Sequence, residues 1–374
     1  MPKKLEFRDL RTIEALEVEG PRNITEVARK LGMPAETLRK RVRRMTSRFS
    51  LRFYLNIYHA NLGLKKAVVF AQANPGYENM LFDSLKTNDF WLSINRCYGM
   101  NEGCFAIYTI PSNQTGDFEA FVRHLQDIGV ASQSRLVWST CFHYVHLTSK
   151  WFDKASKIWN FKWDDWTKEI PKQGVKLPPT LLDPEEFPIK GDKTDILILK
   201  ELEKNPLIRM TELAKRIGIS QQLAAYHYLR HIKEQGLIES FEIAFSYFDK
   251  PSSDNFVFLL EFSNYENFAK FSSSLLDKPF ARGLGKVLGQ NALLAHLYLP
   301  RSEFRRFVSD LSGFIRAGML ENYSYIILDP SKSLRQTISY EHFEKKKWQY
   351  NHEKHIKNLE KIVKDQGPSK RAAA

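Results

Sequence analysis

The chain has 374 residues, more than one domain usually holds, and its hydrophobic content of 43% excludes a largely disordered protein. Its 56 Lys and Arg against 43 Asp and Glu give a net charge of +13, which favours a polyanionic partner such as nucleic acid. No stretch reaches the roughly 20 apolar residues of a membrane helix. The charged start MPKKLEFRDL is unlike a signal peptide, and three cysteines at unpatterned spacing fit a reducing cytoplasm.

Residues 1–57 are predicted to form a winged helix-turn-helix. RDLRTIEALEVEG has apolar residues at helical spacing, and a short second helix is expected between the N-cap Thr25 and the turn at Gly32. A third helix follows, with Leu38, Val42 and Met45 on one face. The stretch SLRFYLNIY after it is typical of a wing strand. Three helices, a glycine turn before the third and a β wing define this fold.

The third helix of this region carries an unusual excess of positive charge. Between Arg29 and Arg52 there are nine basic residues and one acidic residue. In a winged helix this element lies in the major groove of DNA, where arginines contact phosphates or guanine edges. The candidate DNA-binding residues here are Thr37, Arg39, Lys40, Arg41, Arg43, Arg44, Arg48 and Arg52.

Residues 58–150 are predicted to form a second kind of domain. KKAVVFAQA, FWLSINRCYG, GCFAIYTIP and SRLVWSTCFHYV indicate strands, while YENMLFDSLKTN and GDFEAFVRHLQDIG indicate helices. The order βαββαβ is that of the ferredoxin-like fold. The next segment, 151–190, has four tryptophans in an amphipathic stretch and then a proline-rich linker. We expect these tryptophans to pack on a neighbouring domain.

The second half of the chain repeats the first. TEVARKLGM returns as TELAKRIGI, the YEN at Tyr77 returns at Tyr265, and YGMNEGCFAIYTIP returns as LGQNALLAHLYLP, in the same order. A second winged helix is therefore expected at 191–248 and a second βαββαβ domain at 249–329, followed by a basic helical tail at 330–374. The predicted fold class is α+β, with two tandem repeats of a winged helix-turn-helix and a ferredoxin-like βαββαβ domain.

The second winged helix has lost most of the positive charge of the first. The outward face of its third helix is expected to hold Leu223, Tyr226, His227, Arg230 and His231. This composition favours a reduced or structural role slightly over equal DNA binding. Its candidate DNA-binding residues are Ser220, Gln221, Gln222, Tyr226, His227 and Arg230.

A winged helix followed by a βαββαβ domain with a glycine in its hairpin resembles the Lrp/AsnC family of feast/famine transcriptional regulators, here in a tandem-duplicated, archaeal-type form. The resemblance implies binding to double-stranded DNA and an intrachain pseudo-dimer that could pair again as a homodimer. It also implies a small-molecule effector site at Gly99, Asn101, Gly289 and Asn291. The family's glycine-aspartate pattern is absent at both hairpins, which favours plain tight turns over an effector site.

The predicted function is a DNA-binding transcriptional regulator or chromatin-associated protein, without enzymatic activity, cofactor or bound metal. Cys141 and His143 share a strand face, but Cys97 and Cys104 are expected too far away to complete a metal site. The alternative is an enzyme similar to the sirohaem decarboxylases, which share this architecture and need cationic and histidine side chains for a tetrapyrrole. Arg96 and His296 are the candidates for that role. A protein-binding adaptor is a third reading.

Overall fold

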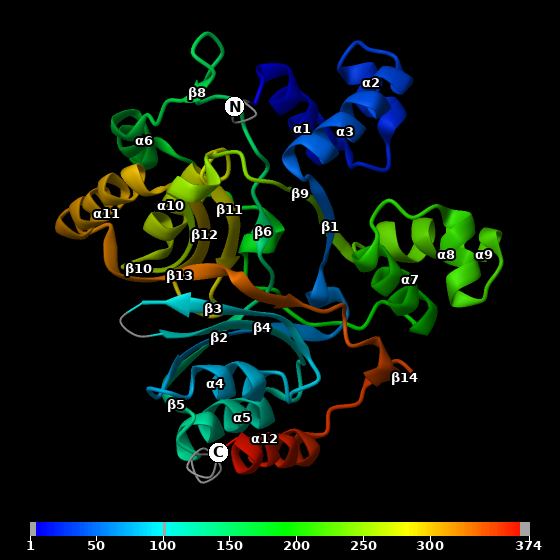
Figure 1. The fold of residues 1–374 in the computed structure, drawn as a ribbon, viewed down its shortest axis with the longest axis vertical. Coiled ribbons are helices and arrows are strands. Elements are labelled where there is room, and N and C mark those ends of the chain that lie inside the picture. The colour runs from blue at the N-terminus through cyan, green and yellow to red at the C-terminus, as the bar shows by residue number, and fades with distance from the viewer. Residues whose placement is uncertain (1–4, 100–101, 367–374) are drawn as a thin grey trace.

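The computed structural model describes residues 5–99 and 102–366 (Figure 1). The N-terminal region forms α1 (Phe7–Glu19), α2 (Ile24–Lys30), α3 (Ala35–Phe49) and the strand β1 (Arg52–Ile57). The apolar positions at helical spacing in α1 and α3, among them Leu10, Ile13, Leu38 and Met45, are fully buried in one core. The periodicity of the sequence therefore fixes which faces of these helices pack together.

The second helical region has a similar order of elements. It consists of α7 (Lys193–Lys204), α8 (Met210–Ile217), α9 (Gln221–Tyr226), the π-helical segment η4 (His227–Lys233) and the strand β9 (Ile238–Ala244). Gly218 ends α8 with a φ of 74°, a left-handed conformation that glycine adopts without steric cost. The segment η4 continues the chain directly from α9, so that the third helix of this region changes from α-helical to π-helical at His227.

The wing strands of the two regions pair with each other, although the sequence predicted a separate wing for each winged helix. β1 and β9 form a two-stranded antiparallel sheet in which Arg52 lies opposite Ala244 and Ile57 opposite Ile238. Each region supplies one strand, and pairing satisfies the backbone groups that a lone strand would leave open. The two helical regions are therefore joined by a ribbon, and they lie on the same side of the molecule (Figure 1).

The other two regions each have the order βαββαβ. The first contains β2 (Leu64–Ala73), α4 (Glu78–Leu85), β3 (Trp91–Tyr98), β4 (Glu102–Pro111), α5 (Thr115–Asp127) and β5 (Ala131–Ser139). The second contains β10 (Ser253–Phe262), α10 (Tyr265–Leu275), β11 (Ala281–Lys286), β12 (Ala292–Pro300), α11 (Arg301–Arg316) and β13 (Leu320–Arg335). The last strand thus continues past the boundary expected at residue 329.

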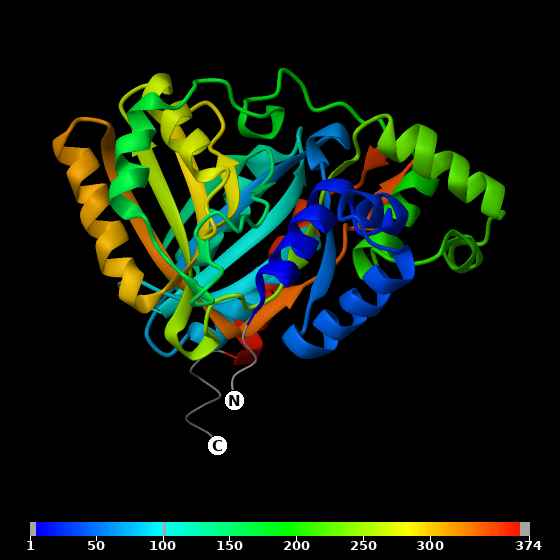
Figure 2. The ribbon, with the colours of Figure 1, turned by 90° about the horizontal axis from the view of Figure 1, so that it is seen from above.

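The strands of the two βαββαβ regions form two layers that pack face to face. The layers are also joined at one edge, where β3 pairs with β13. Within the described residues nine strands form one sheet in the order β5-β2-β4-β3-β13-β10-β12-β11-β6, where β6 is His143–Tyr144. Along β2, Val69 faces the helices while Val68 faces the other sheet, and Val257 of β10 lies in the same inter-sheet cluster as Val68. Both faces of these strands are buried, which explains their nearly continuous apolar sequence. The helices cover the outer faces, as Figure 2 shows from above.

Each βαββαβ region is followed by a segment whose helix packs on the opposite βαββαβ region. After the first come β7 (Phe152–Asp153), β8 (Ile158–Trp159) and α6 (Trp163–Glu169), and after the second come β14 (Phe343–Glu344), β15 (Lys347–Trp348) and α12 (His352–Gln366). Trp166 of α6 stacks on Phe307 in the core of the second region. Leu359 of α12 is buried in the core of the first region, beside α4 and α5. The two halves are therefore interlocked.

Short 3-10 segments complete the connections, namely η1 (His59–Asn61), η2 (Ile170–Lys172), η3 (Pro179–Leu181), η5 (Lys250–Ser252) and η6 (Tyr340–His342). Among the described helices, none has both the length and the apolar character needed to span a bilayer.

Candidate nucleic-acid interface

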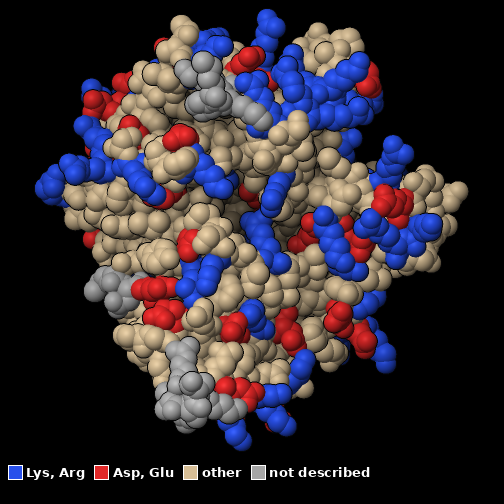
Figure 3. Space-filling view, viewed as in Figure 1, with Lys and Arg blue, Asp and Glu red and all other residues tan. Residues whose placement is uncertain are grey.

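The charged side of α3 lies on the surface of the molecule. Lys and Arg side chains gather over α2 and α3 in the space-filling view (Figure 3). The candidates with exposed side chains are Thr37, Arg39, Lys40, Arg43, Arg44 and Arg52, while Arg41 and Arg48 are half-buried. Leu38 and Met45 point the other way, into the core. The sequence therefore predicted correctly which side of α3 is exposed.

The exposed cations of α3 differ in the partners that they already have. Arg39 lies 3.3 Å from Glu36 on its own helix, and Arg44 Nη2 lies 3.3 Å from Oδ1 of the buried Asp9. Lys40 and Arg43 have no carboxylate partner in the part of the chain that the structure describes. These two side chains can bind a phosphate without giving up an internal ion pair.

Two further predicted contacts on α3 also have a structural role. The guanidinium of Arg41 donates a 3.4 Å hydrogen bond to Thr12 Oγ1 of α1. Arg48 lies over the ring of Phe49, with its guanidinium carbon 5.2 Å from the ring centroid. The first interaction joins α3 to α1, whereas the second lies within α3 itself. Lys40 and Arg43 therefore remain the best-placed phosphate ligands of this helix.

The third helix of the second region presents a mixed surface. Ser220 Oγ accepts a 3.2 Å hydrogen bond from the amide of Leu223 and so caps α9, which leaves this hydroxyl less available to a base. Gln221, Gln222 and Tyr226 are exposed, and Arg230 pairs with Glu234 at 2.6 Å. Leu223 and Leu229 are 43% and 50% exposed, so that apolar side chains occupy much of this face.

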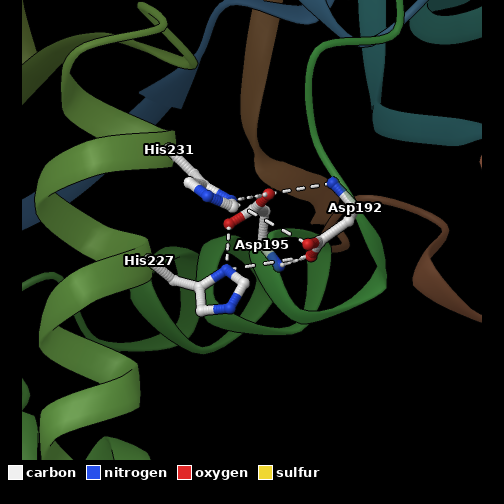
Figure 4. Close-up of side chains that lie close together, drawn as sticks. All are labelled: Asp192, Asp195, His227 and His231. Atoms are coloured by element: carbon white, nitrogen blue, oxygen red, sulfur yellow. Dashed lines mark hydrogen bonds and ion pairs between the residues drawn. The ribbon is translucent and has the colours of Figure 1, made fainter.

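His227 does not lie on that outward face, and the expectation that it does is wrong. Its side chain is buried, and its Nδ1 lies 2.8 Å from Oδ1 of Asp195 at the start of α7 (Figure 4). His231 lies beside it, with Nδ1 3.2 Å from Asp195 Oδ2. The π-helical geometry that begins at His227 accompanies this inward orientation, and a reading based on α-helical periodicity does not anticipate it.

The same cluster includes Asp192, so that four potential metal ligands meet at a place where no metal site was predicted from the sequence. The ligand atoms of Asp192, Asp195, His227 and His231 all lie within 4.8 Å of one another. The signal was present as Asp-x-x-Asp at a helix start and His-x-x-x-His on a later helix. Their large separation in sequence hid the relation.

The hairpin positions expected to bind an effector have different surroundings, and the two glycines are exposed. A Cβ on Gly99 would lie 3.5 Å from Ile326 of β13. Gly289 has a φ of 69°, and its amide donates a 3.3 Å hydrogen bond to Asp183 of the linker. The backbone carbonyl oxygen of Asn291 accepts a 2.8 Å hydrogen bond from the amide of Phe262 in the same half of the chain, and Asn101 lies outside the described residues. The effector site therefore stays a prediction.

The residues considered for tetrapyrrole chemistry are occupied by internal contacts. Arg96 lies 2.6 Å from Glu102, and His296 Nε2 lies 3.2 Å from Asn255 Oδ1. Burial lowers the pKa of His296 to about 3, which keeps its ring neutral. Neither residue lines the cleft of about 600 Å³ between α1 and the segment 146–154. That cleft is instead lined by Arg11, Lys150, Lys154 and His146 together with two carboxylates and apolar side chains.

The three cysteines are buried and free. Burial raises the pKa of Cys97 to about 12 and raises the pKa values of Cys104 and Cys141 further, so that the reactive thiolate is disfavoured. Cys141 Sγ donates to the carbonyl oxygen of Thr180 at 3.1 Å, which gives this thiol a structural role.

Comparison with known protein families gives a match in the second helical region. A family model described as winged helix-turn-helix DNA-binding matches residues 191–239. The chain therefore contains a winged helix-turn-helix in that region. A comparison with curated proteins found no match.

Among solved structures, that of the siroheme decarboxylase NirDL is similar over 96% of this chain and 99% of its own, with a TM-score of 0.54 and 10% identity. At that identity the likeness shows a common fold and no more. The structures of LrpC of B. subtilis and AsnC of E. coli match 36% and 40% of this chain and 94% and 98% of their own. Their TM-scores are 0.28 and 0.27, with 21% and 16% identity, and these values are too low to support an argument about this chain.

Proposed function

We propose that this chain is a DNA-binding transcriptional regulator or chromatin-associated protein of the Lrp/AsnC type, and that α3 supplies most of its phosphate contacts. The observation that carries the proposal is the pair Lys40 and Arg43, exposed on the third helix of a winged helix without a carboxylate partner in the described part of the chain. Cations that repel one another on one helix are relieved by a polyanion. The net charge of +13 also favours binding to a polyanion.

Two linked winged helices support an intrachain pseudo-dimer of two duplicated units. The ribbon of β1 and β9 joins them, and Arg22 of the first donates a 2.7 Å hydrogen bond to the carbonyl oxygen of Pro206 in the second. A regulator that dimerises from separate chains sets the spacing of its two DNA-binding helices through its interface. Here both winged helices belong to one chain, so the fold of that chain sets the spacing. The α9–η4 helix makes the weaker contact because Leu223 and Leu229 are exposed on it.

The test compares matched double variants of the two third helices. Lys40→Ala with Arg43→Ala should lower the slope of log K against log salt by about 1.8, because each lost phosphate contact removes about 0.9. Tyr226→Ala with Arg230→Ala should change the slope less, since that pair offers one cation, already paired with Glu234. Fluorescence titrations of a duplex at several salt concentrations measure both slopes. Equal losses would show that both helices bind phosphate and that α3 is not dominant.

Arg43→Lys separates the two roles of an arginine in the major groove. Lysine keeps a phosphate contact but lacks the planar fork that binds a guanine edge through two bonds. Unchanged affinity and base preference would assign Arg43 to a phosphate. A loss of roughly 1–3 kcal/mol confined to one base position would assign it to guanine.

A second candidate function is a sirohaem-decarboxylase-like activity, which the fold shared with NirDL over nearly the whole chain favours. The cations and His146 of the 600 Å³ cleft have the chemistry to bind tetrapyrrole carboxylates. Mixing the purified protein with sirohaem and recording the visible spectrum tests this candidate. A saturable spectral change that Lys150→Ala weakens would support it, and an unchanged spectrum would remove it.

A further inference from the structure

The cluster of two aspartates and two histidines in the second winged helix has the geometry of a binding site. Asp195 is fully buried and lies between His227 Nδ1 at 2.8 Å and His231 Nδ1 at 3.2 Å. Asp192 lies 3.8 Å from each of the same two nitrogens. Figure 4 shows all four side chains turned toward one another, the aspartates from the start of α7 and the histidines from η4.

The backbone of α7 holds both carboxylates in place. The amide of Asp195 donates to Asp192 Oδ1 at 3.0 Å, and the amide of Asp192 donates to Asp195 Oδ2 at 2.8 Å. This reciprocal capping box fixes the rotamers of both side chains and leaves one oxygen of each, Asp192 Oδ2 and Asp195 Oδ1, without a backbone donor. The two carboxylates are therefore oriented before any ligand arrives.

The histidines are held from a different element. His227 and His231 are four residues apart in η4, so that both rings project to the side that faces α7. Their ring centroids are 4.5 Å apart. A π-helical turn is rare, and such turns occur frequently at functional sites. Here the turn brings two imidazole nitrogens to a buried carboxylate.

The charges of the cluster call for a cation. In the part of the chain that the structure describes, the ion-pair partners of Asp192 and Asp195 are these two histidines, and no Lys or Arg pairs with either carboxylate. Lys193, the neighbour in sequence, instead donates to the carbonyl oxygens of Tyr340 and Phe343. With neutral imidazoles, two carboxylate charges would remain together, that of Asp195 fully buried and that of Asp192 partly exposed. Such a buried charge is costly without a compensating charge.

We propose that Asp192, Asp195, His227 and His231 bind one divalent first-row transition metal ion, and that Zn²⁺ fits the site best. Ligands at 2.0–2.2 Å around a tetrahedral ion lie roughly 3.4 Å from one another. For the two oxygens without a backbone donor, the separations are 2.8 Å from Asp195 Oδ1 to His227 Nδ1 and 3.8 Å from Asp192 Oδ2 to His231 Nδ1, and these bracket that value. Two imidazole nitrogens discriminate against Mg²⁺ and Ca²⁺, which prefer oxygen ligands.

The ion ties the first helix of this winged helix to its third. The aspartates belong to α7, whereas the histidines belong to the segment that extends α9, which carries the exposed Tyr226. Occupancy fixes the orientation of the outward surface of α9 and η4 and stabilises the second winged helix against unfolding. This site is independent of the phosphate contacts proposed for α3.

The experiment uses the full chain without a polyhistidine tag, stripped with a chelator and dialysed. Zn²⁺ is titrated in competition with a chromophoric chelator, and Mg²⁺ is titrated for comparison. One Zn²⁺ per chain and no Mg²⁺ are expected. His231→Gln and Asp192→Asn should each weaken Zn²⁺ binding by more than about 100-fold, since even loss of an outer hydrogen-bond partner costs 10–100-fold. Asparagine retains the helix cap, so the second variant isolates the loss of a ligand charge.

His124→Gln is the matched control, because His124 also lies near two carboxylates, Asp127 at 3.9 Å and Glu360 at 3.4 Å, outside the cluster. Its Zn²⁺ affinity should equal that of the unmodified chain. Thermal unfolding with and without Zn²⁺ gives a second measurement, with a rise in Tm that is absent in His231→Gln. The proposal is overturned if the unmodified chain binds no Zn²⁺, or if His231→Gln and Asp192→Asn bind it with unchanged affinity.

Discussion

Arg44 Nη2 of α3 lies 3.3 Å from Oδ1 of Asp9, a carboxylate of α1 with 1% exposure of its side chain. The adjacent Arg43 is exposed and has no carboxylate partner among the described residues. Two neighbouring arginines of one helix therefore have different surroundings. Arg44 ties α3 to α1, while Arg43 is free to contact a ligand.

Because of this difference, alanine at Arg44 should mainly lower stability, whereas alanine at Arg43 should mainly weaken DNA binding. Arg44→Ala should lower the free energy of unfolding by about 1–3 kcal/mol, because it leaves the buried Asp9 carboxylate without its cation. Arg43→Ala should change stability by less than about 0.5 kcal/mol, as is usual for exposed positions, and should weaken DNA binding. Urea denaturation of both variants, followed by DNA titration at one salt concentration, checks this. Equal destabilisation by the two would contradict the assignment.

The local structure of this chain was largely predictable from its sequence. Leu38, Val42 and Met45 recur at helical spacing, and that spacing decides which side of α3 is buried and hence where its arginines point. The alternation of Val68 and Val69 on β2 likewise follows from strand geometry. Such patterns depend on neighbours within a few residues, and these neighbours are visible in the sequence.

Relations between distant segments were harder to predict. Nothing in SLRFYLNIY shows that its partner strand begins nearly two hundred residues later, because strand pairing depends on which edges remain open after folding. His227 was placed outward because α-helical periodicity was assumed through a segment that is π-helical. The cluster at Asp195 was missed for another reason, because its aspartates and histidines come from two segments that meet only in the tertiary structure.

A buried carboxylate in α1 should make stability depend on pH. Burial raises the pKa of Glu17 from 4.5 to about 8, although Tyr144 Oη at 2.5 Å and the amide of Leu147 at 2.7 Å donate to it. The folded state thus keeps a proton that the unfolded state releases between these pH values, so the free energy of unfolding falls as pH rises through this window. The slope from one such group is at most roughly 1.4 kcal/mol per pH unit.

Glu17→Gln should remove that part of the pH dependence, because glutamine carries no proton that unfolding could release. Glu36→Gln, at an exposed position of α3, serves as control and should leave the dependence unchanged. Denaturation curves recorded at intervals from pH 5 to pH 8 provide the comparison. A Glu17→Gln profile parallel to that of the unmodified chain would show that Glu17 is ionised in the folded state.

Because β2 and β4 lie close together, a substitution that adds a side chain at Gly103 of β4 should lower stability. A Cβ at this position would lie 2.2 Å from the carbonyl oxygen of Ala71 on β2, and backbone cannot move aside as a flexible side chain can. Gly103→Ala should therefore displace the β2–β4 pairing and cost on the order of 1–3 kcal/mol, as overpacking usually does. Gly116→Ala is a suitable control, since a Cβ there meets nothing within 4 Å. Calorimetric Tm values of the two variants would be compared, and equal values would contradict the close approach.

The crossed packing of the C-terminal helix predicts that it stabilises the first half of the chain. Leu359 of α12 is fully buried in the core formed with α4 and α5, whereas Lys361, two residues on, is exposed. Leu359→Ala should cost about 2–5 kcal/mol through lost apolar contact and the cavity left behind, and Lys361→Ala should cost little. Hydrogen exchange measures where the loss appears. Because α12 covers the first βαββαβ region, protection should fall most at α4 and α5, although these helices precede Leu359 by more than two hundred residues. Loss confined to α10 and α11 of the second region would refute the interlocked arrangement.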